Sequence, residues 1–518
     1  MSILNVESVS HGFGGRKIFE DVSFRLLKGE HVGLVGANGE GKSTFLDIIT
    51  GKLMPDKGNV EWSNRVTVGY LDQLTALTKG KTIRDVLKEA FQTMYDREAE
   101  TLQIYDRMGS VTETEMNKLL EEVGEIQSIL ENNGFYMLDA KVEEIANGLG
   151  LGEVGLDKDV EDLSGGQRTK VLLTKLLLQN PSILILDEPT NFLDVEHIEW
   201  LRRYLTQYEN AFILVSHDVT FLNSVVNLIY HVENAGLTRY TGNYEQFMAL
   251  FETQKVQEIK AYDKQQKEVD CMEDFIAKNR ARFSTTGRAK SRQKQLEKME
   301  LIDKPRERIQ PKFKFHEART PSKLIFEAKD IVLGYDEPLT RPLNLALERG
   351  QKVAIRGVNG LGKSTLLKTL LGFIPPVSGE VELGDFLFPG YYEQETSGKN
   401  YKTALDEVWG EYPGLSNSEV RSALARCGLT KEHISSKMMV LSGGENAKVR
   451  LCKLMLKDIN WLVLDEPTNH LDVDAKEELK RAITEYRGTV IVVSHEPEFY
   501  EDWVTDVWNL EEWTTKIV

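Results

Sequence analysis

Short apolar runs organise this chain, and they occur as two matching sets. Residues 32–35 and 353–355 are apolar, and each run precedes a glycine-rich loop and then a segment with apolar residues at helical spacing. Later runs at 183–186 and 461–464 are continuously apolar, which predicts buried strands. The pattern therefore predicts an α/β chain that contains the unit strand, glycine loop and helix twice.

The spacing of matching residues measures this repeat. Lys42 corresponds to Lys363 and Gln73 to Gln394, with an offset of 321 in both cases. Further along the chain the offset is 278, for the pairs Ser164 and Ser442, Asp187 and Asp465, and His217 and His495. The first copy therefore carries about 43 additional residues before its serine, and a repeat of this length indicates a duplicated domain.

The additional residues are predicted to form a helical hairpin, the arm, at about 91–134. Helical patterns cover 91–108 and 113–130 around a break at Gly109-Ser110, and Thr112 and Glu115 have the spacing of a capping box. Ten acidic and three basic residues between Asp96 and Glu131 give the arm a net charge of −7. Either this is a solvated charged face, or the arm contacts a basic protein surface.

A linker of different composition separates the two copies. Helical spacing from about 244 to 282 predicts a helix about 55–60 Å long, followed by a break at 284–287 and a shorter helix that ends before Pro305. The predicted turn at 278–298 has a net charge of +7. Its acidic residue is Glu297, and its eight basic residues are Lys278, Arg280, Arg282, Arg288, Lys290, Arg292, Lys294 and Lys298.

This basic turn is informative because the whole chain of 518 residues has a net charge of −17. Such an acidic chain is not a general nucleic-acid binder, so any contact with RNA must come from a local patch. Either the turn belongs to a solvated connector, or it binds RNA phosphates while Phe283 stacks on a base or ribose. We expect a first domain at 1–243, a helical linker at 244–323 and a second domain at 324–518.

The remaining composition indicates a cytoplasmic location. No apolar run approaches the length of a membrane span, and residues 1–10 lack a signal-peptide pattern, so we do not expect a membrane pore. Three scattered cysteines, at 271, 427 and 452, suit a reducing compartment and make a zinc site an unfavourable interpretation.

Each glycine loop has the residue types that bind nucleotide phosphates. Glycines let the backbone approach phosphate oxygens, and a helix N-terminus aims free N–H groups at them. The lysine reaches the terminal phosphates and the serine hydroxyl can ligate Mg²⁺. The candidate ATP-binding residues are Gly36, Ala37, Asn38, Gly39, Glu40, Gly41, Lys42, Ser43 and Thr44 in the first copy, and Gly357, Val358, Asn359, Gly360, Leu361, Gly362, Lys363, Ser364 and Thr365 in the second.

Further motifs follow in the same order in both copies. A strand that ends in Asp-Glu can deliver the aspartate to Mg²⁺ and the glutamate, Glu188 or Glu466, to the attacking water. Phe13 and Tyr335, upstream of the loops, are either core aromatics or stack on adenine. The Ser-Gly-Gly signatures that precede the acid pairs are Ser164, Gly165, Gly166 and Gln167, and Ser442, Gly443, Gly444 and Glu445.

Together these motifs resemble the ABC-type ATPases over nearly the whole chain. The details are similar to the ABC-F subfamily: two nucleotide domains on one chain, an arm in the first only and a charged helical linker. Matching motifs are Asp-Glu-Pro-Thr-Asn-His-Leu-Asp at 465–472, Tyr-Thr-Gly-Asn-Tyr at 240–244 and Arg-Gln-Lys-Gln-Leu at 292–296.

The resemblance implies a head-to-tail sandwich with two ATP sites, and with ATP and Mg²⁺ as cofactors. It implies catalytic roles for Glu188, Glu466, His217, His495, Gln73 and Gln394, and Mg²⁺ ligation by Ser43, Gln73, Asp187, Ser364, Gln394 and Asp465. The first site would join the first glycine loop to Ser442 and Gly444, and the second site would join the second loop to Ser164 and Gly166.

The resemblance also implies a translation factor that binds the tRNA exit site of the ribosome when closed on ATP. Its linker would contact the peptidyl-site tRNA near the peptidyl-transferase centre, and its arm the stalk region. An antibiotic-resistance protein that displaces drugs from the ribosome is the alternative within the family; the short linker turn favours the general factor. The ATPase subunit of a transporter and a DNA-repair ATPase are less favoured, so neither a membrane subunit nor DNA is expected as a partner.

Two residues depart from the family pattern. Phe192 stands where histidine is usual, and Asn446 follows the second signature where arginine is common. Both departures put the equality of the two sites in doubt.

Overall fold

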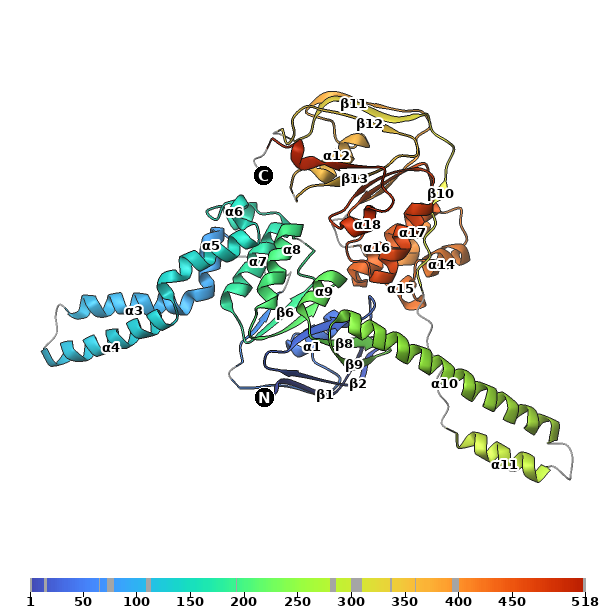
Figure 1. Ribbon diagram of the computed structural model, residues 1–518, viewed down its shortest axis with the longest axis horizontal. Helices are drawn as coiled ribbons and strands as arrows, with labels where there is room; N and C mark the ends of the chain where they lie inside the picture. The colour runs from blue at the N-terminus through green and yellow to red at the C-terminus, as the bar shows by residue number, and fades with distance from the viewer. Residues whose placement is uncertain are drawn as a thin grey trace.

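The chain forms two α/β halves of the same plan, each built on a mostly parallel sheet (Figure 1). The structure is a computed structural model, and it describes residues 2–13, 16–64, 66–71, 79–108, 113–191, 193–279, 286–299, 310–335, 338–358, 360–393 and 400–515. None of the helices within these ranges is both long and apolar enough to cross a membrane.

The central sheet of the first half has six strands. Their order is β5 (Val68–Tyr70), β6 (Ile183–Asp187), β7 (Ala211–Val215), β3 (His31–Val35), β8 (Leu228–Glu233) and β9 (Gly236–Thr241). All pairs are parallel except β8 with β9. Every residue of β7 is buried, because helices or a second sheet cover both faces, and this burial explains the continuous apolar runs.

A second, antiparallel sheet covers one face of this central sheet. It consists of β2 (Arg16–Leu27), β1 (Ser2–Phe13) and β4 (Lys57–Trp62). Helix α1 (Lys42–Ile49) lies between the two sheets, where Phe45 and Leu46 pack in one apolar cluster with residues of both. The glycine loop before α1 is therefore held at the carboxyl end of β3.

Helices cover the opposite face and carry the motifs of the first half. They are α2 (Ile83–Lys88), α5 (Leu138–Gly148), α6 (Leu151–Val154), α7 (Gly165–Gln179), α8 (Val195–Thr206) and α9 (Val219–Val225). Leu184 and Phe212 of the sheet share an apolar cluster with Leu173 and Leu177 of α7. This packing fixes the signature at the start of α7 relative to the acid pair that ends β6.

The arm is a helical hairpin, as the sequence predicts, made of α3 (Gln92–Met108) and α4 (Glu113–Asn132). Ile104 of α3 and Val123 and Ile126 of α4 are buried in the cluster that extends from the core. The predicted break at Gly109-Ser110 and the cap at Thr112 lie outside the described residues. In Figure 1 the arm projects from one side of the molecule.

The second half repeats the plan without an arm. Its central sheet is parallel throughout, in the order β15 (Pro389–Tyr392), β17 (Trp461–Asp465), β18 (Thr489–Val493), β13 (Lys352–Arg356) and β19 (Asp506–Asn509). The antiparallel sheet is β12 (Leu343–Glu348), β11 (Leu324–Val332) and β14 (Ser378–Leu383). The helices are α12 (Lys363–Leu370), α13 (Ala404–Glu411), α14 (Asn417–Arg426), α15 (Lys431–Ser435), α16 (Gly443–Leu456), α17 (Val473–Glu485) and α18 (Pro497–Tyr500).

The linker contains α10 (Tyr244–Asn279) and α11 (Thr286–Glu297), which lie side by side and project away from the arm (Figure 1). The break predicted at 284–287 is wrong in its second part, because α11 already begins at Thr286. Arg288, Lys290, Arg292 and Lys294 therefore belong to a helix rather than to a turn. Arg280 and Arg282 lie outside the described residues, as does Phe283.

Both ends of the linker are anchored in the cores of the two halves. At its start, Phe247 of α10 is buried against His231 of β8, with ring centroids 5.2 Å apart. At its end, Phe313 and Phe315 are buried in the helical core of the second half, and β10 (His316–Glu317) pairs with β16 (Asp458–Ile459).

Candidate active sites

The two glycine loops have the same local geometry. Helix α1 begins at Lys42 and α12 at Lys363, each directly after a glycine in the left-handed region, Gly41 at φ 102° and Gly362 at φ 96°. The lysine folds back over its own loop in both copies. Lys42 Nζ donates to Gly36 O at 2.8 Å, and Lys363 Nζ donates to Gly357 O at 2.7 Å.

A strand brings an aspartate to each loop. Ser43 Oγ donates to Asp187 Oδ2 at 3.0 Å, which joins α1 to the carboxyl end of β6. In the second half, a hydrogen bond from Ser364 reaches Asp465, but burial outweighs it and raises the pKa of Asp465 to about 6. The sequence-predicted pairs of serine and aspartate are therefore adjacent in both halves.

The glutamates that follow these aspartates have unusual backbone geometry. Glu188 has φ 50° and Glu466 has φ 47°, in the left-handed region that non-glycine residues rarely occupy. Such conformations cost about 1–3 kcal/mol and cluster at functional sites. The same strained geometry therefore recurs at the glutamate of the acid pair in both copies.

Each glutamate lies beside its histidine, but the two pairs differ electrostatically. Glu188 Oε1 is 3.6 Å from His217 Nε2, and burial and the Asp187 charge raise the pKa of Glu188 to about 8. Burial also lowers the pKa of His217 to about 3.

In the second half the histidine is closer. Glu466 Oε1 is 3.3 Å from His495 Nε2, and Glu466 Oε2 accepts from Asn469 Nδ2 at 2.7 Å. Burial opposes ionisation of Glu466, but the hydrogen bond and charge of His495, with Lys363 and Asn469, hold its pKa below the ordinary value.

The signatures cap the helices that follow them. Ser442 N–H donates to Glu445 Oε2 at 2.9 Å while Glu445 N–H donates to Ser442 Oγ at 3.3 Å, so the two residues form a capping box at the start of α16. Ser164 and Gln167 form the same box at the start of α7. The first residues of both signature helices therefore present backbone N–H groups at a helix N-terminus.

The first glycine loop lies against the signature of the second half. Asn38 Nδ2 donates to His470 O at 2.9 Å, across the boundary between the halves. A Cβ atom added at Gly39 would lie 2.3 Å from Glu445 Oε1, so this loop is packed directly on the second signature. The negative charge of Asp472 also acts on Lys42, and both residues line a cavity of about 100 Å³ with His217.

Asp194 and Asp472 are functional candidates that the sequence motifs do not single out, although Asp472 ends the motif at 465–472. Lys170 Nζ is 3.2 Å from Asp194 Oδ2, and Lys448 Nζ is 2.7 Å from Asp472 Oδ2. The Asp194 charge in turn acts on Lys363 of the other half. The 278-residue offset relates the two lysines as well, and this regularity was the signal that could have found the pairs.

The structure describes some of the other residues that the sequence analysis singled out. Gln73, Gln394, Asn359 and Phe192 lie outside the described residues. Phe13 and Tyr335 are 51% and 67% exposed, so the interpretation of them as core aromatics is wrong. Asn446 donates to Leu441 O at 3.1 Å and so binds the segment before its signature, as Arg168 does in the first half through Glu161 O.

The geometry agrees with comparisons to known proteins. The sequence model of the ABC transporter family matches residues 19–191 and 340–469, and a second model, also described as ABC transporter, matches residues 230–315. The chain therefore belongs to the ABC ATPases and is an enzyme that binds and hydrolyses ATP.

Its relatives define the branch of that family. An uncharacterised ABC transporter ATP-binding protein of Bacillus subtilis, YfmM, is 63% identical over the whole of both chains. ABC transporter F family member 2 of Arabidopsis thaliana is 38% identical, over 97% of this chain and 76% of that protein. The chain is accordingly a member of the ABC-F family.

Among solved structures, archaeal ABCE1 shares the fold. In the complex of archaeal ribosomal stalk protein aP1 and archaeal ribosome recycling factor aABCE1, the similarity has a TM-score of 0.57 at 20% identity, over 97% of this chain and 87% of that chain. At this identity the likeness concerns the arrangement of the two ATPase halves.

Proposed function

We propose that the two halves form two composite ATP sites, each made of one glycine loop and the opposite signature. In the first site, Lys42 and Glu188 would face Ser442 and Gly444; in the second, Lys363 and Glu466 would face Ser164 and Gly166. ATP carries negative charge that the loop and the opposite helix N-terminus share, so ATP favours the closed arrangement and hydrolysis releases it. The contact of Asn38 with His470 supports this pairing.

Mg²⁺ fits the same sites. Ser43 Oγ and Asp187 Oδ2 are two oxygen atoms 3.0 Å apart beside the glycine loop. Mg²⁺ prefers oxygen ligands and is usually held by one or two protein groups together with substrate phosphates. No cluster of three or more acidic, histidine or cysteine side chains that could hold a metal occurs in the described ranges. Ser43 and Asp187, with Ser364 and Asp465 in the other site, would hold the ion, which would stabilise charge on the phosphates.

We further propose that the closed form binds the ribosome at the tRNA exit site, in the cytoplasm. The linker would lie near the peptidyl-site tRNA and the peptidyl-transferase centre and adjust translation there, and hydrolysis would release the protein. The observation that carries this proposal is the position of positive charge. Lys290 and Lys294 on α11 and Lys298 after it are exposed on a hairpin that projects from the ATPase core of an acidic chain (Figure 1).

The charge is confined to one part of the hairpin. Helix α10 has five lysines and eight acidic residues, so it carries no excess of positive charge, whereas α11 has four basic residues and one acidic. A solvated connector would not need this segregation. Lysine and arginine side chains on one projecting helix are suited to the backbone phosphates of RNA.

The arm has the opposite sign and projects the other way. Its exposed apolar side chains include Leu102, Tyr105, Leu120 and Ile129. Acidic charge beside exposed apolar groups suits a basic protein partner, such as a ribosomal protein. Among structural neighbours, one is titled a model of ribosome-bound archaeal Pelota and ABCE1, which is in keeping with this setting for the shared fold.

The test uses a variant that binds ATP but does not hydrolyse it, Glu188→Gln with Glu466→Gln. With ATP, this variant should co-sediment with ribosomes and inhibit translation in a cell-free system, whereas the wild type with ADP should stay in the supernatant. If the trapped variant also stays in the supernatant at saturating ATP, the ribosome proposal is wrong, and the ATPase assignment is unaffected.

A charge variant then locates the contact. Replacing Arg288, Lys290, Arg292 and Lys294 with alanine in the trapped variant should weaken ribosome binding and reduce its salt dependence, with nucleotide binding unchanged. Arg292 also lies over the Phe275 ring at 4.6 Å, so its removal loosens the hairpin. A cleaner variant therefore replaces Lys290, Lys294 and Lys298. The matched control removes three exposed lysines of α10, Lys260, Lys264 and Lys267, and should bind ribosomes normally.

A further inference from the structure

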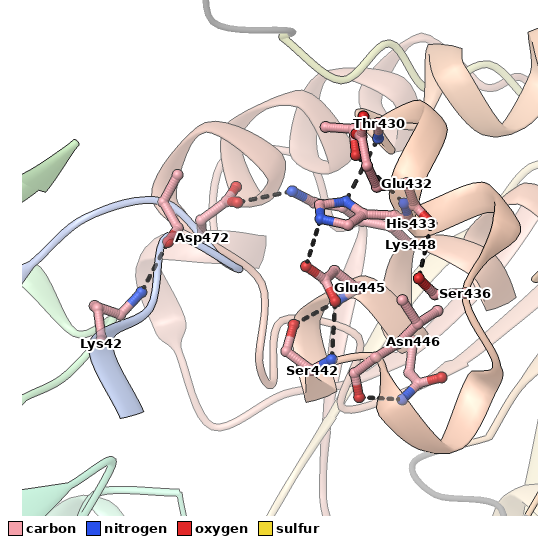
Figure 2. A network of polar contacts seen from close by, with 12 residues as sticks. Lys42, Thr430, Glu432, His433, Ser436, Ser442, Glu445, Asn446, Lys448 and Asp472 are labelled. Atoms are coloured by element: carbon pink, nitrogen blue, oxygen red, sulfur yellow. Dashed lines mark hydrogen bonds and ion pairs between the residues drawn. The ribbon is translucent and has the colours of Figure 1, made fainter. Parts of the chain in front are cut away.

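The first composite site contains a buried pair of a histidine and a glutamate that the second site lacks. His433 Nε2 is 3.1 Å from Glu445 Oε1, and each side chain is 8% exposed (Figure 2). With the 278-residue offset, His433 corresponds to Gly155 and Glu445 to Gln167. The corresponding positions around the other signature therefore carry neither the histidine nor the glutamate.

The hydrogen bonds around the pair define its orientation. Thr430 N–H donates to His433 Nδ1 at 3.4 Å as part of the capping box of α15, and the opposite nitrogen of the ring, Nε2, lies 3.1 Å from Glu445 Oε1. The other carboxylate oxygen, Oε2, accepts from Ser442 N–H at 2.9 Å. The Glu445 carboxylate thus lies between the His433 ring and the backbone N–H of Ser442 at the start of the signature helix.

The pair lies directly against the phosphate-binding loop of the first half. A Cβ atom at Gly39 would be 2.3 Å from Glu445 Oε1 and 3.5 Å from His433 Cε1. A carboxylate at this position repels the phosphates that the loop binds. Lys448 follows one turn later on α16, but its ammonium group is paired with Asp472 at 2.7 Å (Figure 2). Among the described residues, His433 is the side chain with an ionisable nitrogen in ion-pair distance of the Glu445 carboxylate.

The capping box itself does not require the charge. Gln167 makes the same box with Ser164 through a neutral amide, with Ser164 N–H to Gln167 Oε1 at 3.1 Å. The negative charge of Glu445 is thus a feature of the first site alone, and so is the histidine that faces it.

We propose that His433 is a positioning residue of the first composite site, an inference that rests on the proposed ATP-driven closure. It holds Glu445 back against the N-terminus of α16 and offsets its charge, so that the N–H groups of Gly443 and Gly444 can receive ATP phosphates. The second site needs no such partner, because Gln167 is neutral.

The test measures closure directly, without ribosomes. Dyes on Asn59→Cys and Glu380→Cys, two exposed positions on the antiparallel sheets of opposite halves, report closure by energy transfer in the full chain with Cys271→Ser. The Glu188→Gln and Glu466→Gln background prevents turnover. If ATP changes the energy transfer equally with and without His433, the present proposal is wrong. If ATP never changes the energy transfer, the proposed ATP-driven closure is itself wrong.

His433→Ala should raise the ATP concentration for half-maximal closure about ten-fold, since the polar ring nitrogen that lies against the buried Glu445 charge is lost. In the Glu445→Gln background the same substitution should change it less than about two-fold, because no charge remains to offset. An equal loss in both backgrounds would assign His433 a packing role and overturn the proposal. Lys431→Ala, an exposed residue of the same helix, is the control and should leave closure unchanged.

The converse variant does not touch the histidine or its helix. Gln167→Glu introduces a carboxylate into the second signature, where Gly155 provides no partner, and should weaken closure about ten-fold. Closure as tight in Gln167→Glu as in its parent would show that a signature carboxylate needs no compensation, and would also overturn the proposal.

Discussion

The two glycine loops are the same in sequence plan but meet their opposite halves differently. Around the first loop, Gly39 is packed on Glu445, whereas a Cβ atom at the matching Gly360 would meet no described atom within 4 Å. The glutamates differ too: burial raises the pKa of Glu188 to about 8, while His495 and its neighbours hold the pKa of Glu466 below its ordinary value. Duplication therefore preserved the chemical groups of the sites and changed the electrostatics around them.

Substitution of the two glutamates should have the largest effect on the comparison of the two sites. Under the proposed function, Glu188→Gln with Glu466→Gln should lower steady-state ATP hydrolysis about a thousand-fold, because the proposed bases that polarise the attacking water are then absent from both sites. The rate of phosphate release by each single variant measures how much of the hydrolysis each site contributes. Turnover above about one tenth of wild type in the double variant would show that these glutamates are not the catalytic bases.

Removal of the lysine from each buried lysine–aspartate pair should have the next largest effect. Lys448→Met leaves Asp472 without its partner and should lower the free energy of unfolding by about 3 kcal/mol, as should Lys170→Met for Asp194. Urea denaturation of both variants, compared with Lys457→Met at an exposed position, measures the difference. Unfolding curves that coincide with the wild type would mean that the pairs contribute no net stability.

Alanine substitutions at the loop glycines should affect ATP binding at the two sites to different extents. Gly39→Ala and Gly360→Ala carry a similar backbone penalty, since φ is +79° and +86°, but only the first meets Glu445. The half-saturating ATP concentration for closure should therefore rise about ten-fold more for Gly39→Ala. Equal effects would mean that the contact seen at Gly39 is not retained when ATP is bound.

The exposed aromatics should give the smallest effect. Phe13→Ala and Tyr335→Ala should each raise the half-saturating ATP concentration about five-fold if the rings stack on adenine. Inorganic tripolyphosphate, which has no base, provides the comparison in a competition assay. Equal losses for ATP and tripolyphosphate would show that these rings support the loop rather than the adenine.

The sequence predicted what depends on local pattern. The apolar runs before Asp187 and Asp465 are central strands, and the glycine loops lead into α1 and α12 as expected. The helices of the arm and the first linker helix also fall close to their predicted ranges. These features follow from periodicity and glycine positions, which a single sequence displays.

The pattern of residues alone does not indicate contacts between distant segments. The family resemblance implies that the first glycine loop faces the second signature, but it does not predict that Gly39 lies directly against Glu445, about 400 positions away. His433 was overlooked because a single histidine in a short helix has no sequence signature. Gly287 predicts a break and so places the start of the second linker helix too late, although glycine is tolerated near a helix start, where few backbone bonds are lost.

The attachment of the linker has a mechanical consequence. Helix α10 starts beside the cavity shared by Lys42 and Asp472, and the returning chain is tied to α17, where Glu478 Oε1 accepts from Phe313 N–H at 3.0 Å. Asp472 caps the start of α17, so one end of the hairpin lies at the cavity that Asp472 lines and the other end is bound to the helix that follows this residue. The 36 residues of α10 extend about 54 Å, so a tilt of about 5° at the feet swings the far end by about 5 Å. The length of α10 would therefore convert a small displacement at its attachment into a large one at its far end.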